Sequence, residues 1–566
     1  MVLLYKNKGQ LFDLDNYRGI FIRLLCLSIL QKWLYQKCSP IVDLCGSELA
    51  FGGRTKRSVK EVLLIVRLIQ DYCNWCKQPL ILKFLDVTKF FDKMNYKKCL
   101  IEAFRSGVTG KYWKLYKVIN ERKRCTPVTP LGECPEMNIE EIFLQGSCDA
   151  MIMAWNLVDA MNKCEDDVYD PVIVIDGVKI PRLLFVDDIL EITKSFADLD
   201  VSIAGNETFE KTNRIDFKLT KCKLICSNCN PAEEIKMNEA VLEVVDDHEY
   251  LGSIISAKGR KSDLLKRTVD CRGVINEIVE ICQVGGVNEL CLNFTTMLID
   301  LCFKSKFKHG CEVWDDFTKT ELATINKLIP NMIKRILQMP NSTPTAAVIH
   351  DLGIVDLDLE VAMERVLLAS AVVEMDDNRI CKRLFMAMFE KRIPGFCTSL
   401  LDALEVLGMK SLSDLEGVTD KRKHVKSLMV ETQKKRLLNR MMEGSKTDVM
   451  LKNFDYNGRM KQYLLVLPFN EARIVFMLRA KMFPTKWNFP NRWSASKLCV
   501  FCCQPDVDEH LFSCCGYMDI HQFEITHDMF MKLDIGMDIL SSGAKILLQM
   551  YERLLLTNED KDMNER

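Results

Sequence analysis

The pattern of hydrophobic and polar positions changes about halfway along the chain. Up to about residue 230, helical and strand patterns are mixed. Residues 61–72 (EVLLIVRLIQDY) have apolar side chains at helical spacing, and residues 80–87 (LILKFLDV) form a short apolar run that predicts a strand buried on both faces. From about residue 258, long amphipathic patterns such as LLKRTVDCRGVINEIVEIC and ELATINKLIPNMIKRILQM predict helices with few strands between them. The sequence therefore predicts an α+β unit followed by a helical half.

A β-hairpin is predicted later in the first half. Residues 172–175 and 178–186 are two apolar runs on either side of Asp176-Gly177, a pair that is favoured in the tight turns of hairpins. The second run leads directly into Asp187 and Asp188. We therefore expect these two acidic residues at or beside a strand.

Acidic residues thus stand beside two predicted strands. Asp86 ends the run LILKFLD, and Asp187 and Asp188 lie in LLFVDDIL. A charged pair inside an apolar strand is costly unless a bound cation or another partner compensates it. Carboxylates that converge from adjacent strands bind a pair of Mg²⁺ ions and support in-line phosphoryl or nucleotidyl transfer. Solvated acids at surface turns are the alternative, and the spacing alone allows a nuclease, a phosphatase or a polymerase.

Composition and charge narrow the class of protein. The chain has 566 residues, with 77 Lys and Arg against 78 Asp and Glu, so it is not uniformly basic. Local patches can still bind phosphate whatever the total charge. The longest apolar stretch, residues 20–34, contains Arg23 and Lys32 and is too short for a membrane span, and no secretory signal is seen. We expect an intracellular protein, in the nucleus or the cytoplasm, with no membrane partner.

Three segments are locally basic. They are residues 258–267 (KGRKSDLLKR), 304–308 (KSKFK) and 421–440 (KRKHVKSLMVETQKKRLLNR). The usual explanation of such a run is a solvated helix face. The alternative is a set of phosphate contacts that are independent of base sequence and sensitive to salt.

The chain has 25 cysteines, and most are expected to be small buried hydrophobic residues in a reducing compartment. The segment Cys499-x2-Cys502-x7-His510-x4-Cys515 differs, because it has the ligand types and spacing of a small zinc knuckle. The fourth ligand is either Cys515 or the neighbouring Cys514. A thiol-rich hairpin without metal is the alternative.

Eight short motifs follow one another along residues 1–370. Two of them contain the acidic residues, at 84–92 (FLDVTKFFD) and 185–188 (FVDD). The other six are 16–20 (NYRGI), 52–58 (beginning GGR and ending in Ser), 144–146 (LQG), 221–223 (KCK), 250–252 (YLG) and 309–314 (HGCEVW). In their order along the chain, these eight motifs resemble the motifs of reverse transcriptases of non-LTR (LINE-type) retrotransposons. That family commonly carries a similar Cys-Cys-His-Cys element near the C-terminus.

The resemblance implies roles for the acidic residues and one lysine. Asp86 and Asp187 would bridge two Mg²⁺ ions, with Mn²⁺ as a substitute; one ion would lower the pKa of the primer hydroxyl and the other would neutralise the triphosphate. Asp188 would be a nearby third carboxylate. Lys221 would protonate the pyrophosphate leaving group, or else be a solvated lysine at a strand edge.

The resemblance also implies contacts to the nucleotide and the template. Phe91 would stand against the sugar 2′ position and exclude ribonucleotides by clash, with plain core packing as the alternative. Arg18 and Arg54 would contact phosphates, with surface ion pairs as the alternative. Gln145 and Gly146 would lie in the motif that contacts template and nucleotide.

The chain departs from the family pattern at three motifs. Residues 89–92 read KFFD where KAFD is usual, and Val186 stands where alanine is usual. Around Gln145, residues 142–144 (IFL) replace the expected Gly-Val lead, and the proline expected after Ser147 is missing. Losing small and turn residues there would distort the loop that faces the incoming base pair. A decayed or repurposed copy is therefore a second interpretation.

The implied architecture is an α+β right-hand polymerase with an antiparallel sheet in its palm, followed by an all-α thumb and a helical C-terminal region. Fingers and palm would occupy residues 1–235, and the rest of the palm with the primer grip and thumb 236–375. A helical extension (376–490), the zinc knuckle with structural Zn²⁺ (491–520) and a helical tail (521–566) would follow.

The implied function is RNA-directed DNA polymerase, extending a DNA 3′ end on an RNA template with deoxynucleoside triphosphates. No endonuclease domain is found in the sequence, so target nicking would need an endonuclease supplied separately, nicked DNA or a missing exon. Two other functions remain open: a catalytically decayed or domesticated nucleic-acid-binding protein, and a two-metal nuclease.

Overall fold

The structure, a computed structural model, describes residues 1–6, 9–13, 16–88, 90–121, 123–129, 132–139, 153–154, 174–213, 215–231, 234–257, 261–284, 292–314, 317–444, 446–485, 488–489, 498–499, 503–512, 526–533 and 535–564. The chain divides into two compact units. Unit 1 comprises Met1–Asp263, Val313–Asp315 and Ala371–Thr398, and unit 2 comprises Leu264–Glu312, Asp316–Ser370 and Ser399–Arg566. Each is described by itself. The strands lie in unit 1, whereas the described part of unit 2 is helical.

A five-stranded sheet forms the centre of unit 1. Its strand order is β10 (Arg182–Phe185), β11 (Asp188–Thr193), β3 (Leu80–Asp86), β12 (Lys223–Ser227) and β15 (Glu243–Val244). All neighbours are antiparallel except β12 and β15. The middle strand β3 is buried from its first residue through Leu85, which confirms the strand predicted there from its continuous apolar run.

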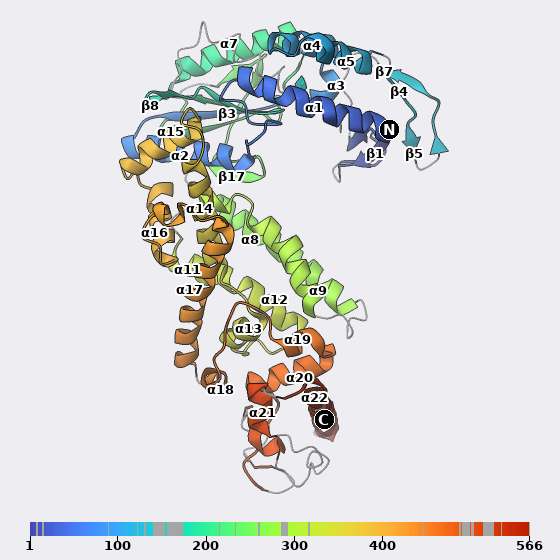
Figure 1. Cartoon of the computed structure of the whole chain (residues 1–566), viewed down its shortest axis with the longest axis vertical. Helices are drawn as coiled ribbons and strands as arrows, with labels where there is room; N and C mark the ends of the chain where they lie inside the picture. Colours follow the sequence, from blue (N-terminus) through green and yellow to red (C-terminus); the bar gives the residue numbers. More distant parts are fainter. Residues whose placement is uncertain are drawn as a thin grey trace. The chain divides into compact units, whose positions relative to one another are not determined.

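Four helices cover one face of this sheet and complete its core (Figure 1). They are α1 (Leu25–Cys45), α4 (Tyr96–Arg105), α5 (Gly110–Asn120) and α7 (Phe196–Asn213). Leu85 of β3 and Ile189 of β11 pack in this core with Leu100 and Ile203 from the helices. Because side chains alternate between the two faces of a strand, Asp86 lies on the other face of the sheet, away from these helices.

The predicted helix at residues 61–72 is confirmed as part of α2 (Val59–Cys76). It packs against α15 (Ile380–Glu390), and Arg379 beside α15 makes a buried ion pair with Glu61 of α2. The backbone N–H of Phe396 donates a hydrogen bond of 2.8 Å to the Asp71 carboxylate. These contacts hold residues 371–398 within unit 1. The proposed domain boundaries stay predictions.

The predicted hairpin is confirmed at β8 (Val174–Ile175) and β9 (Val178–Lys179), with Asp176 and Gly177 both at positive φ in the turn. The apolar run expected to continue to residue 186 is interrupted at Pro181, which has no N–H to donate to a strand partner. After this break the chain starts β10 and pairs with β11.

Smaller elements complete unit 1. They are β1 (Val2–Tyr5), β2 (Tyr17–Ile20), β4 (Lys123–Cys125), β5 (Val128–Thr129), β6 (Gly132–Glu133), β7 (Met137–Ile139), β13 (Lys236–Met237), β14 (Ala240–Val241), β16 (Asp247–Tyr250), β17 (Ser253–Ser256) and α3 (Phe90–Lys93). The 3₁₀ turn η4 (Cys311–Val313) has Cys311 and Glu312 in unit 2 and Val313 in unit 1.

The helices that lie wholly or mainly in unit 2 confirm the predicted helical half. They are α8 (Lys261–Val284), α9 (Leu292–Leu298), α10 (Ser305–Phe307), α11 (Lys319–Asn326), α12 (Leu328–Ile336), α13 (Thr345–Leu352), α14 (Leu357–Val373), α16 (Phe396–Val406), α17 (Lys421–Glu443), α18 (Asp448–Lys452), α19 (Gln462–Val466), α20 (Phe469–Arg479), α21 (His527–Lys532) and α22 (Met537–Asn564). Shorter turns of π or 3₁₀ helix are η3 (Ile299–Lys304), η5 (Leu412–Leu415) and η6 (Asp508–Phe512).

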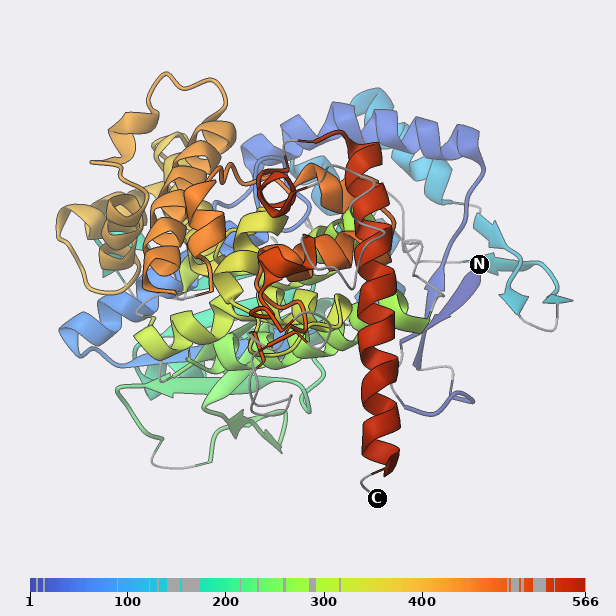
Figure 2. The same cartoon turned by 90° about the horizontal axis from the view of Figure 1, so that it is seen from below.

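The long helix α22 packs against α20 in unit 2 (Figure 2). The Arg473 guanidinium of α20 stacks over the Tyr551 ring of α22, and Ser541 donates a hydrogen bond to Glu471. No helix among the described residues has the length and apolar content that crossing a membrane requires.

Candidate active site

Two of the predicted carboxylates meet because of the register between β3 and β11. Asp86, the last residue of β3, is the cross-strand partner of Asp188, the first residue of β11. Asp187 precedes Asp188 in the turn from β10 and is exposed, whereas Asp86 and Asp188 are half-buried. Paired residues on antiparallel strands point to the same face, so both carboxyl groups lie on the face away from α7.

Burial and two neighbouring carboxylates raise the proton affinity of Asp188, and one lysine opposes this effect. Burial is the largest cause, followed by the charges of Asp187 and Asp86; together, against the opposing charge of Lys221, they raise the pKa of Asp188 to about 6. The Lys221 ammonium lies 2.7 Å from Asp86 Oδ1, as a hydrogen-bonded ion pair. The lysine singled out from the sequence thus contacts one of the two carboxylates assigned to metal binding.

These side chains suit Mg²⁺ in their chemistry. Carboxylate oxygens are the ligands that hard divalent cations take, and a cation would relieve the repulsion that raises the pKa of Asp188. Within the described residues, however, no three or more His, Cys, Asp or Glu side chains lie close enough together to hold a metal ion. Lys221, which is paired with Asp86, would compete with a cation for that carboxylate.

The Phe185-Val186-Asp187 turn is held tightly from one side. Val186 is buried at φ +59°, a strained conformation for a β-branched residue. The N–H of Phe51 donates to the Leu184 carbonyl at 2.8 Å, which brings Gly52 against this turn. The glycine motif at residues 52–53 and the Asp-Asp motif, far apart in sequence, are therefore neighbours.

Gly52→Ala is expected to destabilise the protein by about 1–3 kcal/mol, because the core here has no room for a methyl group. An added Cβ would lie 2.5 Å from Val186 Cγ2 and 2.6 Å from the Val186 backbone nitrogen. The matched control is Gly273→Ala in α8, where a Cβ meets no atom within 4 Å. Thermal unfolding followed by circular dichroism measures the difference, and equal midpoints for the two variants would contradict the prediction.

Arg54, predicted to contact phosphate, makes an ion pair and several hydrogen bonds within unit 1. Its side chain is 4% exposed, and its Nε donates to Asp43 Oδ1 at 3.0 Å. Its other nitrogens donate to the backbone oxygens of Asp43, Ser47 and Ala50. In this conformation Arg54 fixes the loop before the glycine motif. Its assignment to phosphate stays a prediction.

Several other predicted residues are described only in part or not at all. Arg18 lies in β2 and Phe91 in α3, but their side chains are outside the described part of the structure. Gln145 and Gly146 lie outside the described residues, so the motif with the largest departures is untested. Tyr250 of the YLG motif is buried, and its ring packs against Phe84 of β3 at a centroid distance of 5.4 Å.

A buried ionic network lies on the opposite face of β3 and was missed by the sequence analysis. The Lys83 ammonium is fully buried, 2.7 Å from Glu191 Oε2 in β11, and it donates to Ser202 Oγ and Asn206 Oδ1 of α7 at 2.6 Å each. Buried Arg182 lies 3.7 Å from the same glutamate. Burial alone would raise the pKa of Glu191, but Lys83 and Arg182 outweigh it and lower this pKa to about 2. The sequence did contain a signal for this network: Lys83 lies inside a run predicted to be buried on both faces, and a buried charge needs a partner.

No model of a known protein family matches the chain, and no curated protein matches its sequence. Among solved structures, telomerase from Candida albicans in complex with a TWJ fragment of telomeric RNA matches at TM-score 0.31 and 12% identity, over 63% of this chain and 58% of that one. The equivalent complex from Candida tropicalis matches at 0.31 and 12%, over 64% and 57%. The apo telomerase of Candida tropicalis matches at 0.33 and 12%, over 71% and 61%. The chain thus spans less than two thirds of each telomerase chain.

The predicted zinc knuckle is described at two of its four ligands. Cys499 and His510 are buried, with His510 in η6. The backbone N–H of Cys499 donates a hydrogen bond of 2.7 Å to the carbonyl of Gln504. Cys502 and Cys515, as well as Cys514, lie outside the described residues. The structural Zn²⁺ therefore stays a prediction.

Many cations of the basic segments are paired within unit 2. Lys304 and Lys308 both contact Glu360, and Arg440 contacts Asp356 at 2.6 Å. Arg436 and Arg422 likewise pair with acidic residues of α14. The prediction that the basic segments bind phosphate therefore applies only to their remaining exposed cations, such as Lys423, Lys426 and Lys435 of α17.

Proposed function

We propose that this chain is an RNA-directed DNA polymerase of the LINE-like type, which extends a DNA 3′ end on an RNA template. One observation carries the proposal. Asp86 and Asp188 are cross-strand partners in a mixed α/β unit, and Asp187 stands beside them at the same end of the sheet. Burial and the neighbouring charges of Asp187 and Asp86 raise the pKa of Asp188, so negative charge is gathered where nucleotidyl transfer needs cations.

The proposed substrates are an RNA template, a DNA primer and deoxynucleoside triphosphates, with an endonuclease supplied separately. When bound at Asp86 and Asp187, two Mg²⁺ ions would supply the charge stabilisation that phosphoryl transfer requires. Asp188, beside them, would keep the site acidic. Lys221 holds its ammonium against Asp86 Oδ1 at 2.7 Å and would move from there to protonate the leaving pyrophosphate.

A catalytically decayed or domesticated nucleic-acid-binding protein is the second candidate. The ion pair between Lys221 and Asp86 favours it, because this lysine already neutralises one carboxylate needed for metal binding. The departures around Gln145 favour it as well. In this case the exposed lysines of α17 and the predicted knuckle would bind nucleic acid without chemistry.

Asp187→Asn is expected to lower the rate of primer extension by at least about a hundredfold, since a lost metal ligand removes several kcal/mol of transition-state stabilisation. The assay offers the purified full chain a primed RNA template, deoxynucleotides and Mg²⁺. Asp200→Asn, an exposed carboxylate of α7 in the same unit, is the matched control and should leave the rate unchanged.

If the parent chain extends the primer no more than the Asp187→Asn variant, the polymerase proposal fails and the binding protein is favoured. A two-metal nuclease would instead cleave strands without nucleotides and lose that cleavage in Asp86→Asn. Both outcomes can be read from the same labelled substrates on one denaturing gel.

A further inference from the structure

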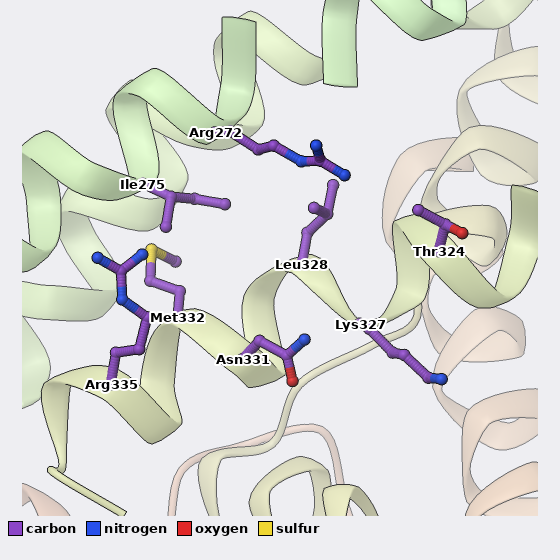
Figure 3. Close-up of a pocket in the computed structure, with 8 residues that line it drawn as sticks. All are labelled: Arg272, Ile275, Thr324, Lys327, Leu328, Asn331, Met332 and Arg335. Carbon is purple, nitrogen blue, oxygen red and sulfur yellow. The ribbon is translucent and has the colours of Figure 1, made fainter. Parts of the chain in front are cut away.

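A cavity of about 300 Å³ opens in unit 2 between α8 and the α11–α12 pair (Figure 3). Arg272 and Ile275 point into it from α8, and residues of α11 and α12 form the facing wall. All of its lining residues belong to unit 2, whereas the candidate active site belongs to unit 1. It is therefore a separate site.

The floor of the cavity is apolar. Ile275, Leu328 and Met332 are buried, with exposed fractions of 9% or less, and they come from both walls. Branched side chains and a polarisable thioether form the kind of surface on which a flat, weakly polar group packs. A small hydrated anion such as free phosphate is not stabilised by packing against such an apolar floor.

The rim is cationic. Arg272 stands on α8, and on the opposite wall Lys327 precedes α12 and Arg335 lies in its last turn. Among the described residues, no Asp or Glu lines the cavity. All three side chains are exposed at the rim. The Arg335 guanidinium donates to Asn276 Oδ1 at 2.9 Å, which holds it across the gap toward α8. Guanidinium groups bind phosphate oxygens through paired N–H donors, so this rim suits a phosphate group.

We propose that this cavity binds a phosphorylated nucleoside. The base packs on Ile275 and Leu328, beneath which Met332 is fully buried, and the phosphate lies between the guanidinium groups of the two walls. Thr324 and Asn331, which also line the cavity, offer hydroxyl and amide groups to the sugar or the base edge. Two sources supply this chemistry: a free nucleotide, and the 5′-phosphorylated end of a nucleic acid strand. The proposal does not depend on polymerase activity.

Calorimetry on the full chain tests it, with ATP, pyrophosphate and adenosine as separate probes in low salt and EDTA. EDTA removes divalent cations, so nucleotide binding at the carboxylates of unit 1 does not contribute. The test variant is Arg272→Gln/Arg335→Gln, whose side chains are exposed and are not needed for the core. The matched control, Lys410→Gln/Arg459→Gln, removes two exposed charges of the same unit that lie outside both the cavity and the basic segments.

We expect ATP to bind about tenfold or more weakly to the arginine variant than to the control, because charge-assisted hydrogen bonds are lost. ATP should also bind more tightly than pyrophosphate or adenosine, since only ATP uses both floor and rim. Equal affinity of the arginine variant and the control overturns the proposal, and so does pyrophosphate binding as tightly as ATP.

A second arm compares a short single-stranded oligonucleotide that carries a 5′-phosphate with the same strand carrying a 5′-hydroxyl. Tighter binding of the phosphorylated strand than of ATP, lost in the arginine variant, identifies the strand end as the ligand. Tighter binding of ATP identifies the free nucleotide. If neither binds, the proposal is overturned. Asp187→Asn should bind every probe like the parent, which separates this result from the fate of the proposed polymerase.

Discussion

Lys83→Met is expected to destabilise the protein by about 3–5 kcal/mol, the range for breaking a buried ion pair on one side. Lys83 lies in the middle of β3 with no exposed surface, and its ammonium sits 2.7 Å from Glu191 Oε2. Methionine has a similar length and fits the space, but it leaves the Glu191 carboxylate without its main partner. Thermal unfolding followed by circular dichroism measures the loss.

The matched control is Lys114→Met, an exposed lysine of α5 in the same unit, for which we expect no measurable change. Removing Glu191 as well would take away the carboxylate that lies 3.7 Å from buried Arg182. The triple variant Lys83→Met/Glu191→Leu/Arg182→Met is therefore expected to recover most of the lost stability, as apolar replacement of buried ionic groups often does. A Lys83→Met midpoint no lower than that of the control would show that the network contributes little.

The Lys83 network also bears on the candidate active site. Lys83 pairs with Glu191 across β3 and β11, and three residues further along the same ladder Asp86 pairs with Asp188. A slip of one residue would turn every side chain of β3 to the other face and would break the buried pair. The Lys83–Glu191 pair, on the sheet face that contacts α7, therefore disfavours a shifted register in which Asp86 and Asp188 would no longer be cross-strand partners. Ion pairs that specify one register are the best-attested use of buried charge.

The parts of the fold that the sequence predicted depend on local signals. The strand ending at Asp86 has a continuous apolar run, and the hairpin has Asp176-Gly177 between two apolar segments. Both signals are complete within about ten residues, because strand burial and turn geometry depend on neighbouring positions. For the same reason the acidic residues could be placed at strand ends, and the register then brought Asp86 and Asp188 together.

The parts that could not be predicted depend on partners distant in the sequence. Lys83 finds Ser202 and Asn206 more than a hundred positions away, and nothing near Lys83 indicates them. The basic segments suggest more exposed positive charge than the fold leaves, because the acidic residues that pair with Lys308 and Arg440 come from residues 356–364. A run of cations shows charge density, but only the fold shows how much of it remains open to phosphate.

A second buried ionic cluster holds three helices of unit 2 together, α13, α19 and α20. The Asp351 carboxylate at the end of α13 has no exposed surface and accepts hydrogen bonds from Arg479 of α20 at 2.7 and 2.9 Å. It also accepts one from the Tyr463 hydroxyl of α19 at 2.7 Å and lies 2.7 Å from His350 Nδ1. Burial alone would raise the pKa of Asp351, but the Arg479 guanidinium outweighs it and holds this pKa far below its usual range. The carboxylate is therefore ionised in the folded protein.

Arg479→Met is accordingly expected to destabilise the protein by about 3–5 kcal/mol, because an ionised carboxylate stays buried without its main counter-charge. Arg459→Met, at an exposed arginine of the same unit, is the matched control and should change stability little. Thermal unfolding of the three proteins at neutral pH gives the comparison. Asp351→Asn/Arg479→Met removes both charges and should be more stable than Arg479→Met alone. If this double variant is the less stable of the two, the bond to Arg479 is not what offsets the burial of Asp351, and the stabilisation must come from His350 and Tyr463.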